Sequence, residues 1–426
     1  MNQIKQGYKQ TKVGIIPEDW EVVKLGELSN KIGSGITPTG GETVYQSSGR
    51  FFIRSQNVGL GSLLLDDVAY ISDEIHSTFK NTEIKQNDVL LNITGASIGR
   101  CAIANKTIEG GNVNQHVCII RPKINKIDTK FLTTFLLSHQ GQKQIDSFQA
   151  GGNRQGLNFA QIASFITPLP PLKEQEKIAQ ILTTWDEAIT KQTELLRAKE
   201  LQKKALMQKL LSGEVRFNGF NDVWQEIRLD KLVFFQEGPG VRNTQYRKSG
   251  VKLLNVGNLN NNILNLSSTE TYISEEEAYG VYKHFLVDEG DLLISCSGIN
   301  SESFKKKIAF VKKEHLPLCM NTSTMRFKNL KNKLLLEYLY FFFQTLFFEK
   351  QVFGVLTGSA QFNFGPTHIK WFKIKLPSLP EQQKIAEVLS LADDEINLLK
   401  NELEELKLQK KALMQKLLTG EVRVKV

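Results

Sequence analysis

The feature that most constrains this chain is a helical segment that occurs twice. Residues 201–217 read LQKKALMQKLLSGEVRF and residues 408–424 read LQKKALMQKLLTGEVRV, with fifteen of seventeen positions identical. The likeness begins further upstream, where LPPLKEQEKIAQIL (169–182) aligns with LPSLPEQQKIAEVL (376–389) at the same offset of 207 residues. Self-similarity at a fixed offset indicates a repeat architecture. The sequence therefore predicts two equivalent long segments, separated by parts that are free to diverge.

Both segments are predicted to be long helices of fixed length. Ser378 and Glu381 have the spacing of a capping box, and Gly213 and Gly420 stand where a left-handed residue ends a helix. The intervening stretch of about 40 residues gives about 60 Å of helix. One inserted residue would advance the far end by about 1.5 Å and rotate it by about 100°. A helix that acts as a ruler must therefore keep a constant length, and the constant offset between the two segments agrees with this requirement.

The two helices are predicted to pair with each other as an antiparallel coiled coil. Their apolar residues recur at spacings of four and three, which is the heptad pattern. In the second helix these residues are Ile385, Leu389, Ala392, Ile396, Leu399, Leu403, Leu406, Leu413 and Leu417. In the first helix, Gln192 and Lys199 interrupt the stripe. A compact domain between the helices brings the end of one near the start of the other, which makes the pair antiparallel and pseudo-two-fold. The alternative is that each helix lies on its own domain.

The regions that precede the helices are predicted to be two related α+β domains. DWEVVKLGELS (19–29) aligns with VWQEIRLDKLV (223–233), YISDE (70–74) with YISEE (272–276), and NDVLLNITG (87–95) with GDLLISCSG (290–298). After these strand-like runs, residues 131–148 and 334–353 each predict one buried helix. The expected organisation is a first domain at 1–168, a central helical region at 169–213, a second domain at 214–375 and a distal helical region at 376–426.

Composition favours a cytoplasmic protein that binds a polyanion. Lysine and arginine number 54 against 45 aspartates and glutamates, and the pI is about 9.1. Such a surplus suggests nucleic acid as a partner. No apolar run reaches the about 18 residues that a membrane span needs. The four cysteines are isolated, which argues against a zinc site and against a disulfide framework.

The sequence lacks the motifs of a catalytic site. It contains no phosphate-binding P-loop and no dinucleotide fingerprint between a strand and a helix. Glu83 and Lys85 have the spacing of a nuclease motif, but a solvated turn is the favoured interpretation. NITGASIGR (92–100) predicts a tight turn whose backbone, with Thr94, could meet a DNA phosphate. We therefore expect no catalytic residue and no metal ligand in this chain.

At this point the repeated segments resemble a known family. LPPLKEQEKIAQIL and LPSLPEQQKIAEVL, each opening a long helix that ends in LLSGEVRF or LLTGEVRV, are similar to the conserved regions of type I restriction-modification specificity subunits. The resemblance covers the whole chain in order. It implies a non-catalytic DNA reader in which each variable domain, the target recognition domain, reads one half of a bipartite target. The helices then set the spacer between the half-sites and bind the modification subunits.

The resemblance also implies the partners. These are double-stranded DNA, two modification (methyltransferase) subunits and, through the complex, the restriction (motor nuclease) subunits. The partner subunits would use S-adenosylmethionine, ATP and Mg²⁺, whereas this chain would hold no cofactor. Two alternatives stay open: a reader subunit of another DNA-modification or defence complex, and a coiled-coil scaffold that does not bind DNA.

Candidate DNA-reading residues follow from the side chains that recognise base edges. Arginine suits guanine, asparagine and glutamine suit adenine, and small hydroxyls suit either; lysines suit phosphates. In the first domain the candidates in loops are Arg54, Ser55, Gln56, Asn57, Thr94, Asn153, Arg154, Gln155 and Asn158. In the second domain they are Arg242, Asn243, Gln245, Arg247, Lys305, Lys306, Lys307, Ser359, Gln361 and Asn363. The half-site sequences themselves do not follow from these residues.

Overall fold

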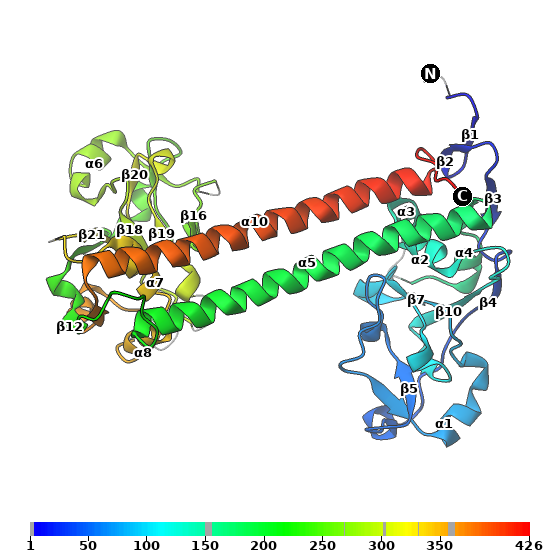
Figure 1. Cartoon of the computed structure of the whole chain (residues 1–426). Helices are drawn as coiled ribbons and strands as arrows, with labels where there is room; N and C mark the ends of the chain where they lie inside the picture. Colours follow the sequence, from blue (N-terminus) through cyan, green and yellow to red (C-terminus); the bar gives the residue numbers. More distant parts are fainter. Residues whose placement is uncertain (1–3, 150–155, 268, 301–303, 331, 357–362) are drawn as a thin grey trace. The chain divides into compact units, whose positions relative to one another are not determined.

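The structure, a computed structural model, describes residues 4–149, 156–267, 269–300, 304–330, 332–356 and 363–426. The chain divides into two compact units. Unit 1 comprises Met1–Thr193 and Glu402–Val426, and unit 2 comprises Glu194–Asn401. Each unit holds one α+β domain and one half of each long helix (Figure 1).

The domain of unit 1 is built on a four-stranded antiparallel sheet with the order β4-β10-β7-β8. These strands are β4 (Ser29–Ser34), β7 (Val89–Asn92), β8 (Cys101–Ile103) and β10 (Val117–Pro122). A three-stranded sheet has the order β6-β5-β9, with β5 (Arg50–Ile53), β6 (Ala69–Ile71) and β9 (Asn112–Val113). β3 (Glu21–Lys24) pairs with β11 (Ile166–Leu169), and β1 (Tyr8–Thr11) pairs with β2 (Gly14–Pro17). The β3–β11 pair joins the beginning of the domain to its end.

The domain of unit 2 repeats the four-stranded sheet, the three-stranded sheet and the terminal strand pair of unit 1. Its four-stranded sheet has the order β13-β21-β18-β19, with β13 (Val233–Glu237), β18 (Leu292–Ser295), β19 (Ile308–Phe310) and β21 (Thr324–Asn329). Its three-stranded sheet has the order β17-β14-β20, with β14 (Val251–Leu253), β17 (Tyr272–Ile273) and β20 (Leu318–Cys319). β12 (Gln225–Arg228) pairs with β22 (Lys373–Leu376), and β15 (Leu259–Asn260) pairs with β16 (Ile263–Leu264). The predicted duplication of an α+β domain is confirmed.

Short helices pack against the sheets of both domains. In unit 1 they are α1 (Asp73–Thr78), α2 (Thr129–Leu137), α3 (His139–Ser147) and α4 (Phe159–Ala163). In unit 2 they are α6 (Glu275–Tyr279), α7 (Leu336–Phe342), α8 (Leu346–Phe353) and α9 (Pro366–Ile369). The expectation of one helix at 131–148 and one at 334–353 was wrong, because each region forms two. Ser138 accepts a hydrogen bond from the Gly141 amide, and Thr345 from the Phe348 amide, so each side chain caps a new helix.

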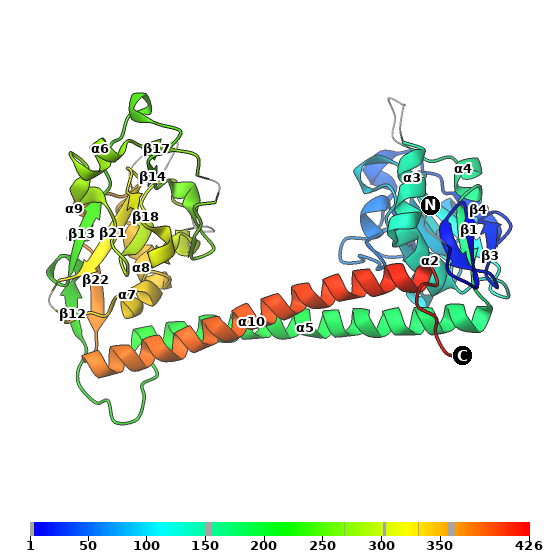
Figure 2. The ribbon, with the colours of Figure 1, turned by 90° about the horizontal axis from the view of Figure 1, so that it is seen from above.

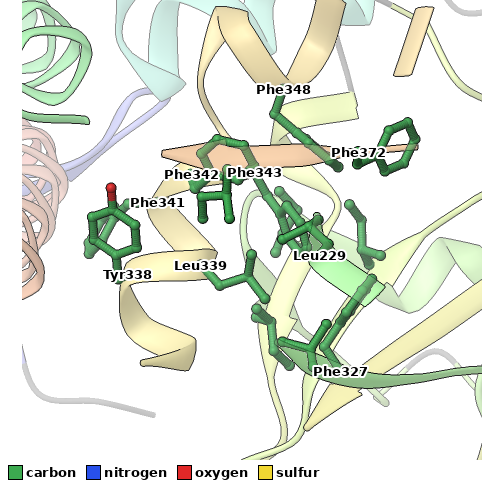
Figure 3. Close-up of a cluster of buried hydrophobic side chains, with 14 of the residues drawn as sticks. Leu229, Phe327, Tyr338, Leu339, Phe341, Phe342, Phe343, Phe348 and Phe372 are labelled. Atoms are coloured by element: carbon green, nitrogen blue, oxygen red, sulfur yellow. The ribbon is translucent and has the colours of Figure 1, made fainter. Parts of the chain in front are cut away.

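The core of unit 2 is rich in aromatic side chains (Figure 3). Phe343 and Phe348 have ring centroids 4.5 Å apart, and Phe327 lies 5.0 Å from Phe343 in an edge-on arrangement. Such pairs contribute about 0.5–1.5 kcal/mol beyond the area they bury. The apolar run at 334–349 therefore belongs to a domain core. None of the helices in the described part of the chain combines the length and apolar character needed to cross a bilayer.

The long helices are α5 (Leu172–Ser212) and α10 (Leu379–Leu418), and they lie side by side within each unit (Figures 1 and 2). In unit 1, Lys410 near the end of α10 pairs with Asp186 near the start of α5. In unit 2, Lys203 of α5 pairs with Asp393 of α10. Late residues of one helix meet early residues of the other, so the predicted antiparallel pairing is confirmed.

The polar residues that interrupt the stripe of α5 have partners on α10. The side-chain amide of Gln192 donates to Glu402 over 2.9 Å, and Lys199 pairs with Glu395 at 2.6 Å. At heptad positions such pairs specify register and partner at some cost in stability.

A buried glutamate at the start of each long helix attaches the helix to the neighbouring domain. In unit 1, Glu174 accepts a hydrogen bond from the Trp20 indole at 3.1 Å and two from the Arg423 guanidinium at 2.8 and 3.0 Å. In unit 2, Glu381 is bound in the same way, by Trp224 at 3.0 Å and Arg216 at 2.8 Å. The arginine of the repeated Gly-Glu-Val-Arg segment, which follows one long helix, thus binds the glutamate at the start of the other long helix.

The same contacts correct the expected capping box at Ser378. Both carboxylate oxygens of Glu381 are taken by Arg216, and Trp224 shares one of them, so this side chain serves the junction with the domain. The glutamine that follows completes the junction. Gln175 bonds the backbone of Asp128, Lys126 and Pro170, as Gln382 does for Leu335, Lys333 and Pro377.

Candidate nucleic-acid interface

The domain of unit 1 gathers polar side chains where β7 ends and β10 begins. We call Thr94, Gln115 and His116 the unit 1 turn cluster. The Thr94 hydroxyl lies 2.7 Å from Nδ1 of His116, and Nε2 of His116 lies 3.3 Å from the Gln115 amide nitrogen. Gln115 is exposed, while Thr94 and His116 are half-buried. The cluster therefore presents an amide, an imidazole and a hydroxyl at one sheet end.

Two loops from elsewhere in unit 1 are held at this end. The amide nitrogen of buried Asn92 donates to the Ser55 carbonyl at 2.8 Å and to the Ser97 hydroxyl at 3.2 Å. The Leu157 amide donates to the Ile93 carbonyl at 2.9 Å, and Gly156 forms a β-bridge with Thr94. The 3-10 helix η2 (Ser55–Asn57) and the segment at 156–158 thus border the unit 1 turn cluster.

The domain of unit 2 has a corresponding group with different chemistry. We call Ser297, Thr322, Ser323 and Asn363 the unit 2 turn cluster. The Cys296 amide donates to the Ser323 carbonyl at 2.8 Å, and the Gly298 amide to the Asn363 side chain at 3.3 Å. The exposed Thr322 donates its amide to the Pro239 carbonyl at 3.0 Å, which brings the following loop, with Arg242, to the same place.

Both clusters are suited to contact a nucleic acid. Amide side chains and hydroxyls read base edges in the major groove, and backbone amides bind phosphate. Gly95 and Gly298 follow the cluster residues Thr94 and Ser297, and both have positive φ, 72° and 64°. A side chain would be strained in that conformation, so glycine keeps the backbone accessible beside the polar groups. The two sites share a frame but differ in every side chain.

Three of the predicted residues of unit 1 lie in or beside the turn cluster, and the other described ones have local roles. Thr94 belongs to the cluster, and Ser55 and Gln56 border it through η2. Arg54 lies over the Tyr45 ring at 5.7 Å and 3.8 Å from Asp67, whose other oxygen accepts from the Gln56 amide. Asn158 caps α4, since its side chain accepts from the Gln161 amide at 2.8 Å. Asn153, Arg154 and Gln155 lie outside the described residues.

The expectation for Asn57 is corrected. Its side chain is only 1% exposed, and its amide nitrogen donates to the Leu64 and Asp67 carbonyls. Its oxygen accepts from the Arg54 amide. All these groups serve the loop, so Asn57 shapes η2 and does not present itself to a base.

In unit 2 the structure places Asn363 in the cluster. Arg242 and Asn243 are exposed in the loop that follows Pro239, whose carbonyl accepts from the Thr322 amide. Gln245 donates to Glu277 at 3.0 Å, and this bond, with that from Ser274, lowers the pKa of Glu277. Arg247 bonds the Thr244 and Tyr246 carbonyls. Ser359 and Gln361 lie outside the described residues.

The three consecutive lysines of unit 2 have different environments. Lys305 pairs with Glu349 at 2.6 Å, Lys306 is exposed, and Lys307 is half-buried with its carbonyl accepting from the Ser295 amide at 3.0 Å. Of these, Lys306 is the one suited to meet a phosphate.

Sequence reasoning missed Gln115, His116, Thr322 and Ser323. The signal was available, because NVNQHV (112–117) and CMNTST (319–324) are polar turns between apolar strands at the constant offset of 207 residues. Their significance depends on β7 and β18 ending beside them, which no local pattern reveals. Among the described residues, no group of three or more histidine, cysteine, aspartate or glutamate side chains is placed to hold a metal ion.

Comparison with known proteins identifies the family. The sequence pattern of the type I restriction modification DNA specificity domain matches residues 17–198 and again 221–408. A putative type I restriction enzyme MjaX specificity subunit from Methanocaldococcus jannaschii is 28% identical over 450 residues, covering 99% of this chain and 98% of that one. The MjaVIII specificity subunit of the same organism is 26% identical, with 99% and 97% covered.

Solved structures show the same fold. A chain from a type I R-M system superposes with a TM-score of 0.61 at 16% identity, covering 96% of this chain and 99% of that one. The HsdS subunit from Thermoanaerobacter tengcongensis gives 0.53 at 18% identity, with 96% and 98% covered. With two pattern matches that together span most of its length, the chain belongs to the type I restriction modification DNA specificity family.

Proposed function

We propose that this chain is the sequence-specific DNA-binding specificity subunit of a type I restriction-modification complex. Each domain reads one half of a bipartite target, and each turn cluster lies at the centre of the reading surface. The observation that carries this proposal is the duplication of one domain frame with different side chains at the same sheet end. Two domains that recognise unrelated DNA sequences require the same backbone framework with different polar side chains where they contact the DNA.

The long helices supply the constant part of the proposed function. Their ends bind the domains through Glu174 and Glu381, so a domain is fixed to its helix by charged and indole contacts. We propose that the helices set the spacer between half-sites and dock the modification subunits. Those partners, with the restriction subunits, supply S-adenosylmethionine-, ATP- and Mg²⁺-dependent chemistry, and this chain contributes recognition only.

The direct test is to map modified bases in a host that expresses this chain with its modification partner. Replacing residues 151–156 (GGNRQG), or exchanging Gln115 and His116 for alanine, should alter one half-site and leave the other unchanged. The matched change in the second domain, Thr322→Ala with Ser323→Ala, should alter only the other half-site. A variant of one domain that changes both half-sites together would contradict modular reading.

A coiled-coil scaffold without DNA is the second candidate, since the helices alone would support it. A gel shift with the assembled complex separates the two. A reader that contacts phosphates loses affinity steeply with added salt, by about 10³ or more between 50 and 200 mM for six or more contacts. Absence of any salt-sensitive binding would favour the scaffold.

A further inference from the structure

The two long helices are nearly identical at their ends and different in the middle. Residues 201–217 and 408–424 share fifteen of seventeen positions, whereas 190–200 (TKQTELLRAKE) and 397–407 (NLLKNELEELK) share only one, Leu196 with Leu403. Because the helices are antiparallel, the divergent middle of α5 lies against the divergent middle of α10. The difference therefore concerns contacts between the helices.

The contacts near the helix ends are symmetric. Two of these contacts are equivalent ion pairs, Lys203 with Asp393 in unit 2 and Lys410 with Asp186 in unit 1. The two lysines are 207 residues apart, and so are the two aspartates. The same holds for Arg216 with Glu381 and Arg423 with Glu174. A helix paired with a second copy of itself would keep all of these bonds. The contacts at the helix ends therefore do not favour the pairing of α5 with α10 over the pairing of α5 with a second α5.

The contacts in the middle are asymmetric. Gln192 bonds Glu402, Lys199 pairs with Glu395 at 2.6 Å, and Glu200 pairs with Lys400 at 2.9 Å. The residues of α5 equivalent to these three partners, at the offset of 207, are Leu195, Ala188 and Thr193. In a pair of α5 helices, Gln192, Lys199 and Glu200 would face those residues and lose their bonds. In a pair of α10 helices, Lys400 would face Lys407.

We propose that the middle of the helix pair is a pairing code that selects α5 with α10 and rejects either helix with its own copy in a second chain. Polar residues at heptad positions are known to specify partners in this way, by attraction in one pairing and unpaired or like charges in the others. Each pair is partly exposed, with Lys199 32% and Glu395 49% accessible, so one pair alone discriminates weakly. Three pairs within one stretch discriminate together.

This code favours the pairing of α5 with α10 of the same chain over symmetric pairing with the equivalent helix of a second chain. Without it, chains could exchange helices and produce dimers in which equal domains are combined. The inference does not depend on what the domains bind, and it applies to the full chain.

Charge reversal in the full chain tests the code. Two differently tagged copies are mixed in denaturant and refolded together, and the fraction that carries both tags is measured by sequential affinity capture and light scattering. Reversing α5 with Lys199→Glu and Glu200→Lys sets like charges against Glu395 and Lys400 but leaves the α5–α5 alternative facing Ala188 and Thr193. The two-tag fraction should rise about 5- to 30-fold. Adding Glu395→Lys and Lys400→Glu should return it to the original level.

A matched control removes the symmetric pairs. Lys203→Ala with Lys410→Ala weakens both kinds of pairing equally, so stability to urea should fall while the two-tag fraction stays constant. If the α5 reversal refolds poorly, Lys199→Gln with Glu200→Gln should give a smaller rise in the same direction. The proposal is overturned if neither α5 variant raises the two-tag fraction, or if the combined reversal fails to restore it.

Discussion

At the scale of single residues, an arginine that follows one long helix neutralises a buried glutamate of the other long helix. Glu174 is 2% exposed at its side chain, and its cationic partner among the described residues is Arg423. Arg423→Met would leave this carboxylate buried with the Trp20 indole alone. We expect a loss of about 2 kcal/mol in unfolding free energy, below the value for a fully buried pair because the Arg423 side chain is 41% exposed.

Urea denaturation of the full chain measures this loss. The double variant Arg423→Met with Glu174→Met removes both charges and should be closer to the parent than the single variant, since no unpaired carboxylate is left. Equal stability of parent and single variant would show that the junction does not depend on the ion pair.

The same arginine makes part of the stability depend on pH. Its hydrogen bond to Asp19 lowers the pKa of that carboxyl from the ordinary value of 3.8. A lowered folded-state pKa stabilises the fold at pH values above 3.8, and this contribution is lost as the pH falls through the folded value. The stability difference between the parent and Asp19→Asn should therefore be constant at pH 5–7 and shrink below pH 4. A difference that grew on acidification would contradict this assignment.

The turn clusters give a residue-level prediction about recognition. In the assembled complex, Gln115→Ala should weaken binding to the cognate target by about 1–3 kcal/mol and relax selectivity within one half-site. Lys306→Ala should weaken cognate and unrelated DNA alike and reduce the salt slope by about one. Competition binding at two salt concentrations separates the two effects. If Gln115→Ala reduced the affinity for all DNA sequences equally, this residue would contact the DNA backbone and not a base.

At this scale the sequence predicted less than the structure shows. Asparagine 57 has the chemistry of a base reader, yet its burial and its three backbone bonds assign it to its own loop. The residue type defines which groups a side chain can bind, but it does not define which way the side chain points. Gln115 and His116 were hidden for the converse reason, because their place beside Thr94 depends on the pairing of β7 with β10.

At the scale of elements, the long helices were the most predictable part, because a heptad pattern over 40 residues leaves little ambiguity. Both are found almost at the expected bounds, Leu172–Ser212 and Leu379–Leu418. The helix pairs α2–α3 and α7–α8 are predicted as single helices, because a break that one capping side chain creates leaves little mark on the residue pattern.

Helix length is expected to set the spacer of the target. Inserting four residues near Leu196 adds about 6 Å, close to two base pairs at about 3.4 Å each, and roughly completes a helical turn. An insertion in α5 alone would misalign pairs such as Lys199 with Glu395, so a matched insertion near Leu403 is the better variant. Mapping of modified bases should show unchanged half-sites with a longer spacer. An unchanged spacer with full activity would show that the helices are not the ruler.

At the scale of the whole molecule, the chain consists of two equivalent halves, and residues 1–216 should form a symmetric dimer. Arg216 of one copy would bind Glu174 of the other, as Arg423 does here. Gln192 and Lys199 would lose their partners, so we expect a weak dimer that the modification subunits stabilise. Its target should be a palindrome built from the first half-site. A fragment that stays monomeric with those partners, or that still selects an asymmetric site, would contradict the duplication.

The junction in unit 1 has one further consequence. Tyr8 donates to the Gly420 carbonyl at 2.7 Å, and Asp19 is bonded to Arg423, so the two extremities of the chain meet where unit 2 has the continuous peptide from Gly213 to Trp224. In topological terms the order of the two repeats along the chain is interchangeable, because the junction in unit 1 is the counterpart of the continuous peptide in unit 2. A circular permutant that joined the present ends by a short linker and opened between residues 213 and 224 would begin with the other domain, yet contain every contact described here.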